Sequence, residues 1–149
     1  HVDYFGVAIC EEAYAIRQMG INIPIMVAEG FFTKEELLWM SAHRVDTVVH
    51  HLSQVETLIS TPLKKDIRVW IKFDSGMHRL GFQQDGFLKA YRALQHCSWV
   101  KQPMTMMTHL ASAAKDCDQQ TRSQLNYFKE VTGSLKGPKS VGNSAAICN

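Results

Sequence analysis

Long hydrophobic runs and clusters of one charge are both missing from this 149-residue sequence. No apolar stretch approaches the roughly 20 residues that a helix needs to cross a bilayer, so no membrane span is predicted. The 16 basic and 14 acidic residues are scattered along the chain, and the net charge is only +2. Without a basic stripe, binding to nucleic acid or to an anionic membrane is not expected. The first residues also lack the basic and apolar segments of a secretory signal, which favours a cytoplasmic protein.

Cysteine is scarce too, and no two cysteines form a Cys-x-x-Cys pair. The four are Cys10, Cys97, Cys117 and Cys148. Such wide spacing favours neither a disulfide framework nor a zinc site, and we expect reduced structural thiols. His50 and His51 are adjacent, but neighbouring side chains on an extended strand point in opposite directions and rarely share a metal. No metal site is therefore predicted.

What the sequence does contain is a regular alternation of short β-prone runs and longer stretches of helical periodicity. The predicted strands cover residues 4–8, 25–27, 45–49, 67–73, 104–107 and 140–142. The predicted helices cover residues 11–19, 34–43, 53–59, 85–94 and 121–131. Thr33 and Glu36 have the spacing of a capping box at the start of the second helix, and Gly20 is the expected stop of the first.

Strands that alternate with helices pair in parallel, because a helix makes each crossover. An open doubly wound sheet and a closed (β/α)8 barrel both fit this pattern. No strand-to-helix turn carries a GxGxxG or P-loop motif, which argues against the open sheet. A barrel needs about 250 residues, so six strands at this spacing make roughly three quarters of one. The chain also lacks an initiator Met and opens into a strand, so we expect a segment of a longer protein.

Two candidate site residues follow the strand predicted at residues 67–73. Lys72 lies at the end of this strand, which is apolar on both faces, and Arg79 lies in the glycine-containing loop beyond it. We expect Lys72 to reach solvent at the rim or to find an anionic partner, because burying an unpaired charge is costly. Arg79 is a planar donor suited to a phenolate or a carboxylate, with a surface ion pair as the common alternative.

Further candidates follow the last two predicted strands, at the edge where parallel α/β folds carry their working groups. His109 can orient a charged group or stack on a planar ring there, although a histidine taken alone is more often a core residue. Asn143 and Ser144 precede small residues, and such a helix start can offer backbone N–H groups and a serine Oγ to a phosphate. An ordinary N-cap at Ser144 is the commoner alternative.

The segments that carry these residues resemble signature segments of bacterial alanine racemases. They are WIKFDSGMHRLGF at residues 70–82, MMTHLASA at residues 106–113 and NSAA at residues 143–146, in the order found in that family. YFGVA at residues 4–8 and IPIMVAEGFF at residues 23–32 are similar to the family's second and third strands. The resemblance implies that residues 1–149 form one incomplete (β/α)8 barrel domain, about strands two to seven, that binds pyridoxal 5′-phosphate.

The resemblance also implies roles for individual residues. Arg79 would contact the phenolic oxygen of the cofactor and, with Met77, help to place the carboxylate of the substrate. His109 would lie beside the cofactor's ring, and Ser144 with Asn143 would contact its phosphate. Four of the residues given roles by the resemblance lie at or after the ends of predicted strands: Lys72, Arg79, His109 and Ser144.

Lys72 matches a position that is carbamylated in many racemases, where the resulting anion would hold Arg79. The family's Schiff-base lysine, ring-contacting arginine and catalytic tyrosine fall outside residues 1–149, so the resemblance implies a chain that is inactive alone. The parent would interconvert L- and D-alanine for peptidoglycan as a homodimer. Two alternatives stay open: a non-catalytic homeostasis barrel that binds pyridoxal phosphate, and a related barrel racemase or decarboxylase. On a purely structural interpretation, a truncated chain would associate to cover its strand edges.

Overall fold

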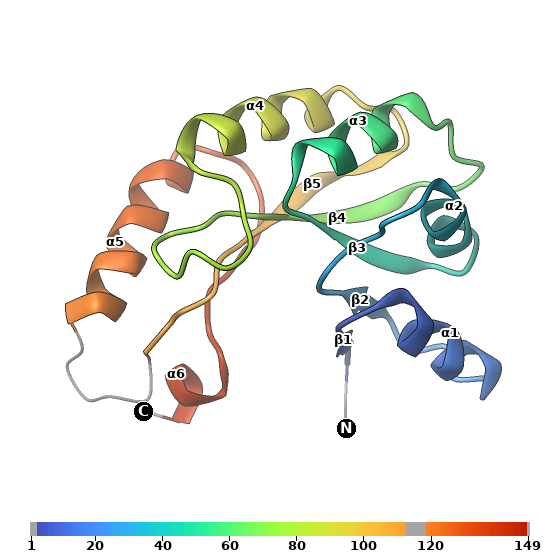
Figure 1. Ribbon diagram of the computed structural model, residues 1–149, viewed down its shortest axis with the longest axis horizontal. Coiled ribbons are helices and arrows are strands. Elements are labelled where there is room, and N and C mark those ends of the chain that lie inside the picture. Colours follow the sequence, from blue (N-terminus) through green and yellow to red (C-terminus); the bar gives the residue numbers. More distant parts are fainter. Residues whose placement is uncertain (1–2, 113–118, 149) are drawn as a thin grey trace.

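The computed structural model describes residues 3–112 and 119–148, which alternate strands and helices around one curled sheet (Figure 1). The strands are Phe5–Val7 (β1), Ile25–Val27 (β2), Val45–Val49 (β3), Ile67–Lys72 (β4), Val100–Met107 (β5) and Lys139–Ser140 (β6). The helices are Cys10–Gln18 (α1), Lys34–Ala42 (α2), Leu52–Ser60 (α3), Gln84–Gln95 (α4), Gln119–Thr132 (α5) and Ser144–Cys148 (α6). All neighbouring strands are parallel, and they lie in sequence order from β1 to β6.

The sheet curls into an arc with the helices along its outer side. In Figure 1, α1 to α5 follow the arc from one end to the other, and its open side lies between α1 and α6. A curled parallel sheet covered by helices on its convex side is part of a (β/α)8 barrel. The predicted fold class, an incomplete barrel, is confirmed, and the open doubly wound sheet is not observed in the described residues.

Strand β4 shows how the two faces of the sheet differ. Ile67, Val69 and Ile71 belong to the buried core between the sheet and the helices. Their neighbours alternate to the opposite face because side chains on a strand have a period of two. Arg68, Trp70 and Lys72 therefore lie on the concave face, so the polar groups of β4 point into the hollow of the arc.

The core is built from the apolar stripes of the helices. Leu37 and Met40 of α2, Leu58 of α3, and Phe87 and Leu94 of α4 are all fully buried. Burying a large apolar side chain stabilises a fold by about 1.5–3 kcal/mol, so these few contacts hold the helices on the sheet. The site edge of the sheet is thus carried on a rigid support.

The predicted helix signals are confirmed. Thr33 Oγ1 accepts the N–H of Glu36 at 3.2 Å, and Glu36 Oε2 accepts the N–H of Thr33 at 3.1 Å. Gly20 follows the last turn of α1 with a φ of 76°, and its N–H donates to the carbonyl of Arg17 at 3.0 Å. These two capping motifs fix where α2 begins and where α1 ends.

Four strands differ from the predicted bounds: β1 and β4 are shorter by one residue at one or both ends, and β5 and β6 differ more. β5 begins at Val100 rather than at residue 104, because Val100 and Lys101 already pair with β4. Pro103 interrupts the strand pattern, since it has no N–H to donate, and the register shifts nearby, between Arg68 and Trp70. β6 covers Lys139–Ser140 instead of residues 140–142.

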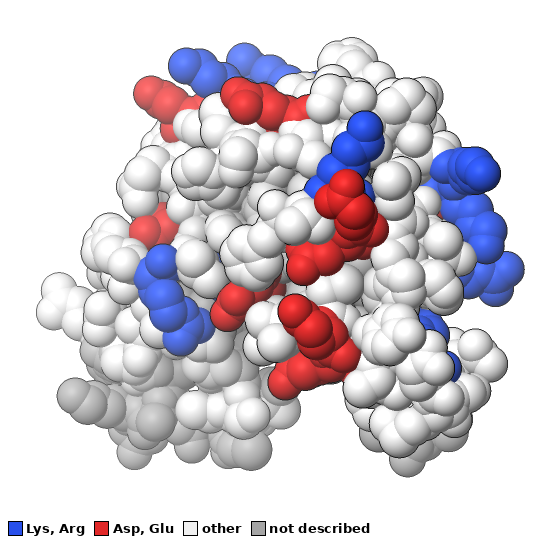
Figure 2. Space-filling model, turned by 45° about the vertical axis from the view of Figure 1, so that its right-hand side comes forward, with Lys and Arg blue, Asp and Glu red and all other residues white. Residues whose placement is uncertain are grey.

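The surface charges, the lengths of the helices and the state of the cysteines can be compared with the sequence predictions. Figure 2 shows basic and acidic side chains next to one another in several places on one face, with uncharged surface around them. Within the described residues, no helix is both long and apolar enough to cross a membrane. Cys10 and Cys97 are buried free thiols, as predicted, while Cys117 lies outside the described residues. Burial, reinforced by the nearby carboxylates of Glu36 and Glu11, raises the pKa of the Cys10 thiol to about 11.

Candidate active site

The carboxyl ends of β4, β5 and β6 lie side by side. Lys72 pairs with Met107, and Met107 pairs with Ser140, so the last residues of the three strands are in register. The loop after β6 is tied to the loop after β5, because Asn143 Nδ2 donates to the carbonyl of Leu110 at 3.1 Å. The three predicted clusters therefore share one edge of the sheet.

A narrow pocket at this edge, with no enclosed room for a water molecule, is lined by four of the six predicted site residues: Lys72, Met77, Arg79 and His109. Asn143 and Ser144 are not among its lining residues. Asn143 Oδ1 instead accepts the N–H of Ala146 at 3.0 Å in the first turn of α6. The alternative that made Ser144 the N-cap is wrong, because Asn143 makes the capping hydrogen bond and Ser144 is the first helical residue.

Lys72 is buried, with 7% of its surface exposed. Within the described residues its ammonium makes neither a hydrogen bond nor an ion pair. Burial lowers its pKa, the positive charge of Arg79 lowers it further, and Asp74 opposes both. No fully buried side-chain nitrogen in the described residues lacks a hydrogen-bond partner, so the tip of Lys72 keeps some contact with solvent. This agrees with the first of the two predicted alternatives, that Lys72 reaches solvent at the rim.

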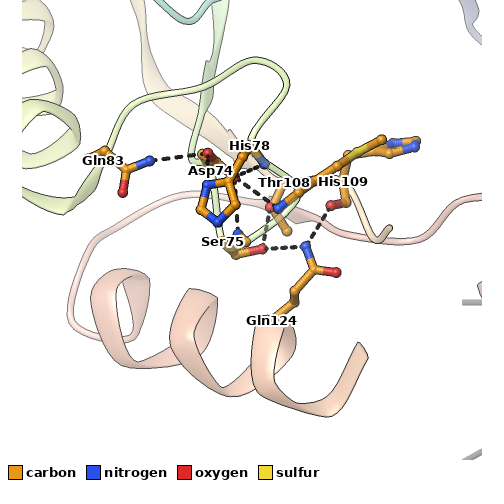
Figure 3. A network of polar contacts seen from close by, with 9 residues as sticks. Asp74, Ser75, His78, Gln83, Thr108, His109 and Gln124 are labelled. Atoms are coloured by element: carbon orange, nitrogen blue, oxygen red, sulfur yellow. Dashed lines mark hydrogen bonds and ion pairs between the residues drawn. The ribbon is translucent and has the colours of Figure 1, made fainter. Parts of the chain in front are cut away.

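His109 and Arg79 add two more basic groups beside Lys72. The imidazole of His109 has a lowered pKa, mainly because of burial and also because of the positive charges of Arg79 and Lys72. In Figure 3 the ring of His109 points away from Gln124. The hydrogen bond between the two residues runs from the Gln124 side chain to the backbone carbonyl of His109, not to its ring. Three basic side chains thus approach one pocket, and their mutual repulsion favours an anion there.

Asp74 is the one carboxylate in the lining of this pocket, and both of its oxygens are in use. Oδ1 accepts the backbone N–H groups of Gly76, Met77 and His78 at 3.0, 3.1 and 3.0 Å. Oδ2 accepts from His78 Nδ1 at 3.0 Å and from Gln83 Nε2 at 3.1 Å (Figure 3). Burial raises the pKa of Asp74, but the hydrogen bonds from His78 and Gly76 outweigh it and lower the pKa overall. Asp74 therefore shapes the loop that carries Arg79.

Gln124 connects that loop to the one after β5. It is 2% exposed, and its Nε2 donates to the carbonyl of His109 at 3.0 Å and to Ser75 Oγ at 3.3 Å. Its Oε1 accepts the N–H of Ala111 at 2.9 Å. Ser75 Oγ also lies 2.7 Å from Thr108 Oγ1, so the two loops are joined twice (Figure 3). Sequence analysis missed this network together with Asp74.

The adjacent histidines His50 and His51 have structural partners. His50 Nε2 lies 3.0 Å from the carbonyl of Glu29, and His51 Nδ1 lies 2.9 Å from Ser53 Oγ. Burial, the first of several influences, lowers the pKa of His50. Residues 3–112 and 119–148 contain no group of three His, Cys, Asp or Glu side chains placed to hold a metal ion.

The fold and the site together define a class of protein: a parallel α/β barrel whose chemistry lies at the carboxyl edge of its strands. The family model described as alanine racemase, N-terminal domain, matches residues 1–149. The chain therefore belongs to the alanine racemase N-terminal domain family.

Individual relatives agree with this assignment. The chain is 42% identical over 144 residues to the alanine racemase of Shewanella loihica and 41% identical over 145 residues to that of Shewanella amazonensis. Each match covers 97% of this chain but 40% of the relative. The chain thus spans about 40% of the length of these curated racemases.

Solved structures support the same fold. The biosynthetic alanine racemase of Pseudomonas aeruginosa superposes with a TM-score of 0.91 at 31% identity, over 98% of this chain and 40% of that one. The alanine racemase of Acinetobacter baumannii gives 0.87 at 29% identity, over 99% and 41%. A histidine racemase from Leuconostoc mesenteroides, at 21% identity, has a TM-score of 0.80 over 95% of this chain and 39% of that one. That last similarity shows the fold alone.

Proposed function

We propose that this chain is part of an alanine racemase that uses pyridoxal 5′-phosphate to interconvert L-alanine and D-alanine. The observation that carries the proposal is the unpartnered, buried Lys72 beside Arg79 and His109 at the carboxyl edge of the sheet. The family membership of residues 1–149 supports the same activity.

The charges of the residues that line the pocket fit an anionic cofactor. Lys72, Arg79 and His109 are basic, whereas the carboxylate of Asp74 is fully used by hydrogen bonds within its own loop. A phenolate, a phosphate or a carbamate would supply the negative charge that these side chains favour. When bound, pyridoxal phosphate supplies an electron sink for the charge that develops at the substrate's α-carbon.

Each site residue has a role in this proposal. Arg79 donates to the phenolic oxygen of the cofactor and, with Met77, orients the carboxylate of alanine. His109 lies beside the pyridine ring, where its lowered pKa favours the neutral imidazole. Ser144 and Asn143 contact the phosphate from the loop after β6. Fixing the substrate in this way contributes to rate because it converts binding into correct orientation.

Lys72 is well suited to carbamylation. The neutral amine, which burial favours, attacks carbon dioxide, so that an N–C bond forms and one proton leaves to solvent. The product is an anion next to Arg79, in place of a second cation. The carbamate would then hold the guanidinium in the orientation that the phenolic oxygen needs.

The whole protein contributes what this segment lacks. We infer that the Schiff-base lysine, the ring-contacting arginine and the catalytic tyrosine lie outside residues 1–149, so the chain alone is inactive. The complete protein acts as a homodimer in the cytoplasm and supplies D-alanine for peptidoglycan. The free thiols of Cys10 and Cys97 agree with a reducing compartment.

The test is complementation of a D-alanine auxotroph by the complete gene, followed by racemisation assays on the purified protein. We expect growth without D-alanine, bound pyridoxal phosphate, and no activity of residues 1–149 alone. R79A should abolish growth, whereas R92A, at an exposed position on α4, should retain it. A well-expressed protein that fails to complement, or that racemises histidine but not alanine, overturns the proposal.

A further inference from the structure

Gln124 is a buried polar residue that the proposed function does not use. It lies on α5, one helix beyond the strand that leads to His109, and 2% of its surface is exposed. A buried side-chain amide is costly unless its donors and acceptor are all satisfied. The hydrogen-bond partners of Gln124 therefore show which segments of the chain it holds in place.

Those partners belong to two different loops. The carbonyl of His109 and the N–H of Ala111 belong to the loop after β5. Ser75 belongs to the loop after β4, which also carries Arg79. A side-chain amide can donate two hydrogen bonds and accept one at the same time, so a single glutamine can hold both loops.

The packing around this amide is close. A Cβ atom on Gly76 would lie 3.5 Å from Gln124 Cγ, so the β4 loop rests directly against the glutamine side chain. Ser75 Oγ is fixed from its other side by Thr108 Oγ1, at 2.7 Å. Both hydroxyl groups are buried. The contact between the loops thus has little room to shift without breaking hydrogen bonds.

We propose that Gln124 is a positioning residue, whose amide sets the separation of Arg79 and His109 across the cofactor. The inference rests on the proposed function for the identity of that cofactor. Gln124 touches neither reacting atom; it acts through the backbone of the loop after β5 and through Ser75. A displacement of about 1 Å in such a site can reduce the rate on the order of 10²-fold.

A purely structural role for Gln124 makes a different prediction, and a control on the same helix separates the two. Thr132 is fully buried on α5, and its Oγ1 donates to the carbonyl of Phe128 at 2.7 Å. T132V therefore removes a buried hydrogen bond from α5 without touching either loop. Q124M keeps the length of the side chain but removes its amide.

The experiment uses the complete protein in its apo form, titrated with pyridoxal phosphate and followed by fluorescence. We expect Q124M to raise the Kd about tenfold, since a site that is loosened by its supporting residues binds less well. T132V should stay within about twofold of wild type even if its Tm falls further. Hydrogen exchange of the Ala111 amide should accelerate in Q124M alone.

Q124E provides a rescue. A neutral carboxylic acid can donate to the His109 carbonyl and accept from the Ala111 N–H, whereas the carboxylate can do only the second. Burial favours the neutral form, so the Kd of Q124E relative to wild type should improve between about pH 8 and about pH 6. The ratio for Q124M should stay constant over the same range.

The outcomes separate the two proposals. Two results would show that Gln124 is not a positioning residue. In the first, Q124M binds pyridoxal phosphate with the wild-type Kd. In the second, T132V and Q124M lose the same amount of Tm and raise the Kd by the same factor. A wild-type protein that neither binds pyridoxal phosphate nor racemises alanine overturns the proposed function instead. The exchange of the Ala111 amide then still decides whether Gln124 holds the loops.

Discussion

Asp46 on β3 and Asp74 in the loop after β4 show opposite effects of their surroundings on the pKa of a carboxyl group. Asp74 accepts five hydrogen bonds from its own loop, and these lower its pKa although burial acts in the other direction. Asp46 lies on the concave face of β3, where burial raises its pKa to about 6. Arg68, the indole N–H of Trp70 and Lys101 oppose that rise but do not cancel it.

The first prediction concerns Asp74. D74N replaces one acceptor oxygen by a donor, so it should lower the free energy of unfolding by on the order of 2–3 kcal/mol at neutral pH. The folded carboxyl has a lowered pKa, so its contribution is full above the unfolded value of about 3.9 and is lost as the pH falls below it. Urea unfolding across this range measures the effect, with D66N at an exposed loop position as the control. Equal losses in both variants would contradict the prediction.

Asp46 should show the reverse pH dependence. Its folded pKa of about 6 lies above the unfolded value of about 3.9, so its contribution to stability is full below pH 4 and is lost as the pH rises through 6. We expect a decrease of roughly 2 kcal/mol in the free energy of unfolding across that window. D46N keeps an oxygen for the hydroxyl of Tyr4 and the indole of Trp70, and should remove the slope. A carboxyl carbon of Asp46 that titrates near pH 4 by NMR would refute this.

At the scale of elements, two buried glutamines connect neighbouring loops by hydrogen bonds at the carboxyl edge of the sheet. Gln54 donates to the carbonyls of Glu29 and Phe31, and accepts from the N–H of His50, just as Gln124 joins the loops after β4 and β5. Gln54 thereby ties the loop after β2 to the loop after β3. Two pairs of neighbouring loops, those after β2 and β3 and those after β4 and β5, are thus each joined by one buried glutamine.

The sequence contains a pattern that indicates burial of Gln124, but hydrophobic periodicity does not take a polar residue into account. Gln124, Phe128 and Val131 have the i, i+4, i+7 spacing of one buried helix face, and all three are buried. A polar residue on such a face must have internal partners, yet the sequence does not say which carbonyls will meet it. Similarly, Asp-Ser-Gly at Asp74 is typical of a turn, but the convergence of three N–H groups on one oxygen depends on the folded loop.

The third prediction concerns the short β-bridge that closes the Arg79 loop. Phe82 donates to Lys72 and accepts from Asp74, each at 2.9 Å, beside Gly81 with a φ of 132°. A Cβ atom at Gly81 would lie 2.7 Å from the Asp74 nitrogen, so G81A should break the bridge and cost about 3 kcal/mol. G20A is the matched control, because Gly20 also has a positive φ of 76° but no atom within 4 Å of a Cβ.

G20A should therefore cost only about 1 kcal/mol, the usual penalty of a left-handed residue with a side chain. Denaturant unfolding of both variants gives the comparison, and a racemase assay on the complete protein should show loss of activity for G81A alone. Similar stability losses at the two glycines would show that the close approach at Gly81 is not tight.

For the molecule as a whole, alternating strand and helix patterns were enough to predict the order and parallel pairing of the sheet. The carboxyl edge follows from that topology, which is why the sequence alone predicts that Lys72, Arg79 and His109 lie together. The hydrogen bonds between residues on different loops could not be predicted from the strand and helix pattern. They depend on side-chain positions set by helix packing, as the separation of Ser144 from the pocket lining shows.

The last prediction concerns the behaviour of residues 1–149 in isolation. β1 and β6 are the outer strands of the described sheet, and each has a strand on one side only. Tyr4, Trp70 and Met107 are half-buried on the concave face, which no described helix covers. Open strand edges and exposed apolar surface favour association, so the isolated chain should form concentration-dependent oligomers in sedimentation velocity. It should also bind a hydrophobic dye that the complete protein binds less, since further barrel strands would cover this face. A dilute monomer that unfolds cooperatively and binds no dye would instead mean that the arc is self-sufficient.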